Sequence, residues 1–286
     1  MPIKKNIGYS ETTPLKQQIF RDFLHLHITL WDAITNKHIY YDSFYYYLDL
    51  TAGTGTNPKD MSLGSPLIFL GAATGRDIPF EAALLERNIA NYEELCLAVS
   101  PYTTNQGSIE KDNIYVQHID HAELLNNPNL WAAYNQLGLA YYDPNNLAVK
   151  DGESKSFNSI VELFNQQEFL RVDFLASVFA TNIKRIRRFT GKCMSDWLSL
   201  IPKKHWLVRR PLDSDAKKWT MFFGTNWVDF PQYKRLEFYS IHSTIGRQIL
   251  EELNYTKEEC AAMGIEKLRK RKKKKEMHQL NLLGEC

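Results

Sequence analysis

The first predicted strand of this chain runs directly into a loop that contains two glycines. Residues 44–50 are four aromatic residues followed by Leu-Asp-Leu, a composition with high strand propensity and no polar alternation. A strand without alternation is buried on both faces, as in a parallel sheet covered by helices. After Asp49 come Gly53 and Gly55, and glycines at this point let a backbone approach a bound nucleotide. The segment therefore predicts an open α/β sheet with a ligand site at the end of this strand.

Four more predicted strands follow, at residues 80–86, 114–120, 137–143 and 172–178, and helical patterns lie between them. Such alternation implies a parallel sheet with right-handed crossovers. Residues 205–209 and 219–223 then predict an antiparallel hairpin joined by a turn. We expect an α/β Rossmann-like class I methyltransferase fold: a mostly parallel seven-stranded sheet, a terminal antiparallel hairpin and flanking helices.

Charge is distributed unevenly along the chain. The 286 residues contain 35 Lys and Arg against 33 Asp and Glu, a net charge of +2. Residues 267–275 alone hold eight cations and no acid, and residues 184–218 hold eleven cations against three acids. The remainder is strongly acidic, so the pattern predicts an acidic body with two basic zones.

Composition places the chain in an ordinary globular class. No apolar run is long enough for a membrane span, and the first residues do not resemble a signal peptide. The four cysteines form no CxxC pair, so we expect no metal site, no disulfide framework and a cytoplasmic location. The predicted organisation is an N-terminal helical extension (1–40), a methyltransferase-like α/β domain (41–258) and a basic C-terminal tail (259–286).

Five short segments resemble the three-Cys-motif partner proteins (TcmP). These segments are YLDLTAGTG (47–55), GSPL (64–67), YDPN (142–145), ATNIKR (180–185) and GTNW (224–227). The resemblance covers roughly residues 10–255 and implies a class I methyltransferase fold, S-adenosylmethionine as cofactor, and a bacterial or phage setting. The chain departs from the family at Thr51 and Thr54, where Phe and Pro are expected, and at Asn146, where Gly is expected.

The predicted cofactor site combines the glycine loop with acids at the strand ends. Asp49 would fix the loop and face the amino group of the methionine moiety. The small loop residues Ala52, Gly53 and Gly55 would admit the ligand. Glu86 would hold the ribose, and Asp120 would hold the adenine. The alternative interpretation is that Glu86 and Asp120 are ordinary acids at strand ends.

The predicted acceptor site is Asp143, Pro144 and Asn145, after the fourth strand. Enzymes that methylate exocyclic amines place an acid or amide here, with an aromatic ring that stacks on the flipped base. Asp143 and Pro144 fit that pattern, whereas a ring is missing unless Tyr141 or Tyr142 supplies it. The alternative is a polar turn.

A basic segment follows the fifth strand and a second precedes the hairpin. Cations at such positions can bind phosphates, although a solvated basic face is the alternative. The candidates are Lys184, Arg185, Arg187, Arg188, Lys203 and Lys204.

These expectations favour an S-adenosylmethionine-dependent methyltransferase acting on nucleic acid, DNA rather than RNA, with an adenine amine as one target. Two alternatives remain open: a non-catalytic module that binds nucleic acid or a partner protein, and a methyltransferase of a small molecule.

Overall fold

The computed structural model describes residues 13–37, 44–57, 59–103, 112–126, 137–144, 147, 155–211, 219–227 and 231–264. One sheet organises them, with strand order β3-β2-β1-β4-β5-β7-β6-β8. Its strands are β1 (Tyr45–Asp49), β2 (Phe80–Leu85), β3 (Asp112–Gln117), β4 (Gly138–Tyr142), β5 (Val172–Phe179), β6 (His205–Arg209), β7 (Trp219–Thr225) and β8 (Phe238–Ser240). In the part of the sheet from β3 through β2, β1 and β4 to β5, neighbouring strands are parallel. The strands β7, β6 and β8 are antiparallel to their neighbours. The predicted Rossmann-like methyltransferase fold is confirmed.

The antiparallel end of the sheet differs from the expectation in one respect. β7 lies between β5 and β6, and β8 adds an eighth strand beyond β6, where the sequence predicted seven strands. β8 has only three residues, which is too short for a periodic pattern to show. Because β7 is antiparallel to both of its neighbours, β6 runs in the same direction as β5.

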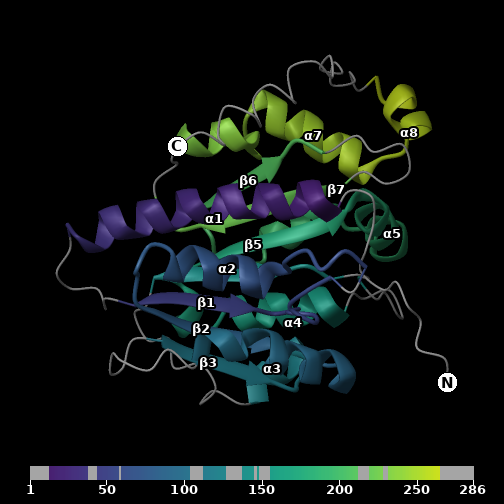
Figure 1. The fold of residues 1–286 in the computed structure, drawn as a ribbon. Helices are drawn as coiled ribbons and strands as arrows, with labels where there is room; N and C mark the ends of the chain where they lie inside the picture. Colours follow the sequence, from purple (N-terminus) through teal and green to yellow (C-terminus); the bar gives the residue numbers. More distant parts are fainter. Residues whose placement is uncertain are drawn as a thin grey trace.

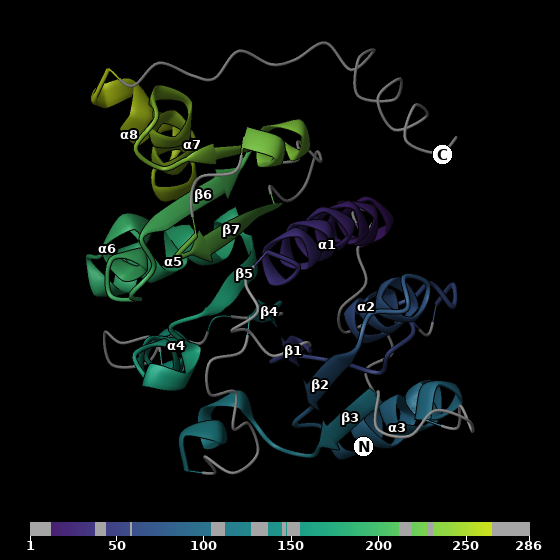
Figure 2. The ribbon, with the colours of Figure 1, turned by 90° about the vertical axis from the view of Figure 1, so that its left-hand side faces the viewer.

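Helices cover both faces of the sheet (Figure 1). On one face pack α1 (Thr13–Thr35), α2 (Ser65–Thr74) and α3 (Ile89–Thr103). On the other pack α4 (Lys155–Phe164), α5 (Ala180–Thr190), α6 (Met194–Leu198) and α7 (Thr244–Asn254), and α8 (Lys257–Ala262) follows α7. Figure 2 shows the sheet between these two layers. None of the helices in the described part of the chain could cross a membrane.

β1 contributes to both hydrophobic cores, as the absence of polar alternation predicted. Tyr45 and Tyr47 pack into the core beneath α1 and α2, and Tyr46 and Leu48 pack into the opposite core. The Tyr47 ring stacks on Phe69 of α2, with centroids 4.0 Å apart. Burial of four large side chains on alternating faces fixes the position of β1 and of the loop that follows it.

Two predicted segments need correction. The basic stretch after the fifth strand is an α-helix, α5, which ends at Gly191 with a left-handed φ of 73°. Between the third and fourth predicted strands, where a helical pattern was expected, the described residues form a 3₁₀ helix, η1 (His121–Asn126). Residues 127–136 and the basic run 267–275 lie outside the described residues. Two further 3₁₀ helices are η3 (Gln167–Phe169) and η4 (Pro231–Leu236).

Candidate functional site

Four acidic residues follow the carboxyl ends of four adjacent parallel strands. In spatial order they are Asp120 after β3, Glu86 after β2, Asp49 at the end of β1 and Asp143 after β4. Register keeps the ends level, because Asp49 lies opposite Leu84 of β2 and Tyr141 of β4. The structure therefore places the predicted acids along one edge, where ligands bind in open α/β sheets.

Asp49 is fully buried at the centre of this row. Its carboxylate accepts hydrogen bonds from the Tyr47 hydroxyl (2.9 Å) and from the Thr51 N–H (3.1 Å). Burial raises the pKa of Asp49 to about 6, and the charge of Asp143 contributes to the rise, while bonds from Ser65, Thr51 and Tyr47 oppose it. The hydrogen bond from the Thr51 N–H ties the Asp49 carboxylate to the start of the glycine loop.

The two glycines of the loop have different surroundings. Both have a left-handed backbone, with φ of 67° at Gly53 and 78° at Gly55. A Cβ added to Gly53 would meet no atom within 4 Å, which leaves room for a ligand. A Cβ on Gly55 would lie 3.0 Å from Ala98 and 3.1 Å from Leu95 of α3. The expectation that both glycines admit a ligand therefore fits Gly53, whereas Gly55 allows the loop to pack on α3.

Glu86 connects the glycine loop to the end of β2. One carboxylate oxygen accepts a hydrogen bond from the Gly53 N–H (3.0 Å), and the other accepts from the Asn88 N–H (2.7 Å). Each oxygen retains a lone pair, so the carboxylate can still accept from a ribose hydroxyl. The neighbouring Ala52 is buried, and its N–H donates to the Leu85 carbonyl at 2.9 Å.

Asp120 is partly exposed at the outer end of the row. It accepts hydrogen bonds from the His121 ring (3.0 Å) and the Ala122 N–H (3.1 Å), and the Arg87 guanidinium lies 3.6 Å away. The hydrogen bond from His121 is the largest influence and holds the pKa of Asp120 well below its usual range. An ionised acceptor is therefore maintained at this position.

Asp143 forms an ion pair with Lys16, a residue of the first turn of α1. Its backbone N–H donates to the Thr51 hydroxyl at 2.8 Å, which joins it to the glycine loop. Burial and then the charge of Asp143 raise the pKa of the neighbouring Tyr141 well above its usual value. Pro144 is buried beside it, and Asn145 lies outside the described residues. Lys16 was not among the predicted site residues, because it lies 127 positions from Asp143 along the chain.

The stacking ring expected near Asp143 is not supplied by the tyrosines of β4. Tyr141 and Tyr142 are both almost completely buried, with 2% and 1% of their surfaces exposed. Because a ring must present a face to stack on a base, neither residue can take that role in this conformation.

Two of the six predicted phosphate-binding cations lie at the wrong edge of the sheet. Lys203 and Lys204 precede β6, which runs parallel to β5, so they lie at the amino ends of the strands, opposite the row of acids. Lys203 is buried, and its Nζ donates to the carbonyls of Phe169 (2.8 Å), Leu170 (3.3 Å) and Val172 (2.6 Å). Burial lowers its pKa to about 8. Lys203 is therefore a structural residue.

The four cations of α5 also include both residues that bind other parts of the chain and a residue exposed to solvent. Arg185 donates to the Leu147 carbonyl at 2.7 Å. Arg187 pairs with Glu259 of α8 at 2.9 Å and lies over the Tyr255 ring, 4.1 Å from its centroid. Lys184 is half-buried, and Arg188 is exposed. Arg185 and Arg187 thus hold neighbouring segments in place, and Arg188 presents its charge to solvent.

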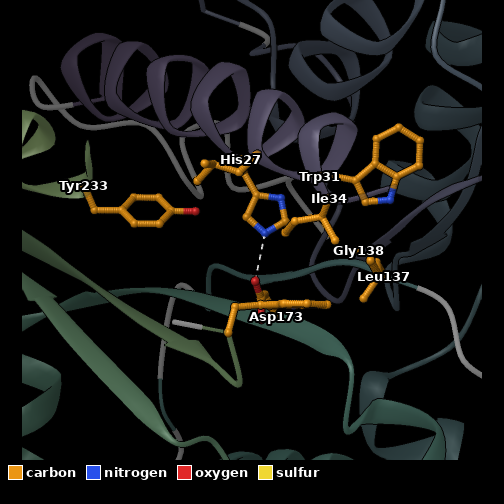
Figure 3. Close-up of a pocket in the computed structure, with 9 residues that line it drawn as sticks. His27, Trp31, Ile34, Leu137, Gly138, Asp173 and Tyr233 are labelled. Carbon is orange, nitrogen blue, oxygen red and sulfur yellow. Dashed lines mark hydrogen bonds and ion pairs between the residues drawn. The ribbon is translucent and has the colours of Figure 1, made fainter. Parts of the chain in front are cut away.

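A small cavity, lined mainly by apolar side chains around His27 and Asp173, lies at the opposite edge, beneath α1 (Figure 3). His27 lies between the Tyr45 hydroxyl (2.7 Å from Nδ1) and the Asp173 carboxylate (3.1 Å from Nε2). The second oxygen of Asp173 is buried without a hydrogen-bond partner among the described residues. The volume is about 20 Å³, which suits one water molecule and is too small for a cofactor. This cavity is separate from the row of acids.

No protein-family model and no curated protein matches this chain. Among solved structures, it is similar to the delta-N METTL16 MTase domain, with 9% identity, a TM-score of 0.44, and coverage of 79% of this chain and 88% of that one. An rRNA methylase from Streptococcus thermophilus gives 11% identity, a TM-score of 0.39, and coverage of 73% and 96%. The Streptococcus mutans protein SMU.1697c in complex with SAH gives 8% identity, a TM-score of 0.40, and coverage of 76% and 99%. Likeness at this level identifies neither the activity nor the substrate of this chain.

Proposed function

We propose that the protein is an S-adenosylmethionine-dependent methyltransferase that modifies an N–H group of nucleic acid, with an adenine exocyclic amine as one target. The observation that carries this proposal is the row of acids beside Gly53, where a side chain would meet open space. The segments that resemble the TcmP family include Asp49, Gly53 and Asp143, so the proposal extends to membership of that group.

The acids suit the chemistry of the proposed cofactor. When bound, that cofactor supplies a methyl group carried on a sulfonium. Asp49 would attract the amino group of the methionine moiety, although its own burial favours the protonated acid at low pH. Glu86 would accept from the ribose hydroxyls, and Asp120, held ionised by His121, would accept from the adenine amino group.

Asp143 would act on the acceptor. Its carboxylate accepts a hydrogen bond from the acceptor N–H and orients the nitrogen lone pair toward the methyl carbon. As the N–C bond forms, the C–S bond breaks with its electron pair left on sulfur, and the nitrogen loses one proton to Asp143 or to water. Orientation rather than strong base catalysis would then supply most of the rate enhancement.

The charges of α5 support a nucleic-acid acceptor. α5 begins where β5 reaches the same edge as Asp143; its exposed cation, Arg188, lies in the last turn, and Lys184 is half-buried. An exposed cation such as Arg188 attracts phosphates with a salt-dependent affinity. The basic run 267–275, which lies outside the described residues, would add sequence-independent attraction.

A binding module without catalysis is the second candidate. Both oxygens of Glu86 already accept backbone hydrogen bonds, and Tyr141 and Tyr142 are buried rather than available for stacking. A protein that binds a partner without catalysis needs neither a free ribose-binding carboxylate nor an exposed stacking ring, so these two observations favour this candidate.

Donor calorimetry and a labelled transfer assay test the proposal. We expect S-adenosylmethionine to bind the wild-type chain, and Asp143→Asn to retain that affinity within about threefold while losing transfer of tritiated methyl to DNA or RNA. Absence of heat at millimolar donor would refute the cofactor assignment. Donor binding without any transfer would favour the binding module, and label found only in protein would refute the nucleic-acid acceptor.

A further inference from the structure

We propose that Lys16 of α1 is a positioning residue of the acceptor site, and that its fixed charge restricts the acceptor to an uncharged N–H group. The inference rests on the proposed methyl transfer and adds two elements to it. The first is a residue delivered from the N-terminal helix. The second is a chemical class of acceptor, a neutral amine or amide as opposed to an ammonium group.

A closed ring of contacts holds Lys16 in place. Its Nζ pairs with the Asp143 carboxylate and lies 6.0 Å above the Trp219 ring. The Trp219 indole N–H donates to the Ser177 hydroxyl at 2.6 Å. The hydroxyl of buried Tyr141 completes the arrangement, because its pKa is raised first by burial and then by the charge of Asp143, and Ser177 acts on the same hydroxyl. Four elements, α1, β4, β5 and β7, thus determine where the ammonium lies, so it is part of the site rather than a mobile surface charge.

Burial of the pair makes the arrangement persistent. Only 16% of the Lys16 side chain and 25% of the Asp143 side chain are exposed. A partly buried pair is screened less by salt than a surface pair, and loss of one partner leaves the other charge uncompensated. Lys16 therefore provides the positive charge that balances Asp143 beside a second carboxyl group, that of Asp49.

The middle of α1 keeps the helix in register on the sheet. His27 is held between the Tyr45 hydroxyl and the Asp173 carboxylate, at 2.7 and 3.1 Å. Phe23 packs edge-on against Phe223 of β7, with centroids 4.9 Å apart. These contacts fix the helix about two to three turns beyond Lys16, so the ammonium cannot move away while α1 stays docked.

The fixed ammonium decides which acceptors can reach Asp143. An N–H group that donates to this carboxylate must approach within a few ångströms of Lys16 Nζ. A neutral exocyclic amine or amide can do so without a charge penalty, whereas a lysine-type ammonium would meet a like charge in a partly desolvated site. The charge arrangement therefore selects a neutral nitrogen, which agrees with a nucleobase amine.

The first test compares two acceptor probes with tritiated methyl donor: a single-stranded adenine-rich oligonucleotide and polylysine. We expect the wild type to label the oligonucleotide and to leave polylysine unlabelled. Lys16→Met should lower kcat on the oligonucleotide at least tenfold while donor affinity stays within about twofold. Lys16→Arg, which keeps the charge, should recover most of the loss. Lys37→Met, an exposed lysine at the other end of α1, should behave as the wild type.

Wild-type kcat in Lys16→Met or label in polylysine would each overturn the inference, whereas donor binding without label in either probe would overturn the proposed methyl transfer. Failure of the wild type to bind donor would instead overturn the proposed function. A readout without cofactor then separates the two: thermal unfolding of Lys16→Met, Asp143→Asn and the double variant. We expect Lys16→Met to lower the melting temperature in the wild-type background and to have little further effect in Asp143→Asn. Additive shifts would show that the two residues do not act as a pair, and would overturn the inference independently.

Discussion

The Glu86 carboxylate accepts a hydrogen bond from the backbone N–H of Gly53 across 3.0 Å, although the two residues are 33 positions apart. The contact ties the end of β2 to the glycine loop after β1. Glu86, which the sequence predicts to bind the ribose, therefore also fixes the loop that would contact the rest of the cofactor. The two roles make different predictions for the same substitution.

Glu86→Ala should weaken both the loop and the proposed donor site. It leaves the Gly53 and Asn88 N–H groups without their partner, which we expect to lower the free energy of unfolding by about 1–2 kcal/mol. Donor affinity measured by calorimetry should fall at least tenfold. Glu94→Ala, an exposed glutamate on α3, is the matched control and should change neither quantity. A loss of stability with donor affinity intact would restrict Glu86 to its structural role.

Alanine at the two loop glycines should separate ligand access from packing. Gly53→Ala places a methyl group in open space, so its cost is the left-handed backbone, about 1 kcal/mol, together with a loss of donor affinity. Gly55→Ala adds contacts of 3.0 and 3.1 Å with Ala98 and Leu95 to the same backbone cost, so it should destabilise more. Chemical unfolding and donor calorimetry on both variants check this order. Equal destabilisation would contradict the assignment of Gly55 to packing.

Asp49 should make stability depend on pH in the mildly acidic range. Its pKa is raised from 3.8 to about 6, chiefly by burial, so the folded chain favours the protonated acid. The stabilising contribution is complete below about pH 4 and is lost as the pH rises through about 6. Relative to Asp49→Asn, the wild type should lose up to about 3 kcal/mol of unfolding free energy between pH 4 and 7. Parallel stability curves for the two proteins would refute this assignment.

Substitution of Lys203 should change the stability of the protein, whereas substitution of Arg188 should change the salt dependence of nucleic-acid binding. Lys203→Met removes a cation that satisfies three carbonyl groups, and we expect it to lower the free energy of unfolding by about 1–3 kcal/mol without changing the salt dependence of nucleic-acid binding. Arg188→Ala should leave stability unchanged and reduce the slope of log K against log salt by about 1. Fluorescence anisotropy with a labelled oligonucleotide at several salt concentrations measures the slopes. A reduced slope of log K against log salt in Lys203→Met would show that Lys203 contacts nucleic acid.

Local sequence patterns identified most of the sheet. The strand predicted at 205–209 coincides with β6, and the strand predicted at 80–86 coincides with β2 to within one residue. Short or highly charged elements were missed. β8 has three residues, and the cations of α5 concealed a helix whose buried face is marked by Ile183 and Ile186. Spacing of those two isoleucines by three positions was the signal that could have revealed it.

The sequence by itself determined which edge of the sheet carries the acids. Each acid directly follows a strand, and adjacent parallel strands end at the same edge, so local order was enough to place Asp49, Glu86 and Asp143 together. Only the tertiary structure decided which cations join them. Lys16 reaches Asp143 from 127 positions away, whereas Lys203 is enclosed by three carbonyls at the opposite edge. The environment of a charge depends on elements distant in sequence that pack around it, and a one-dimensional pattern does not contain that information.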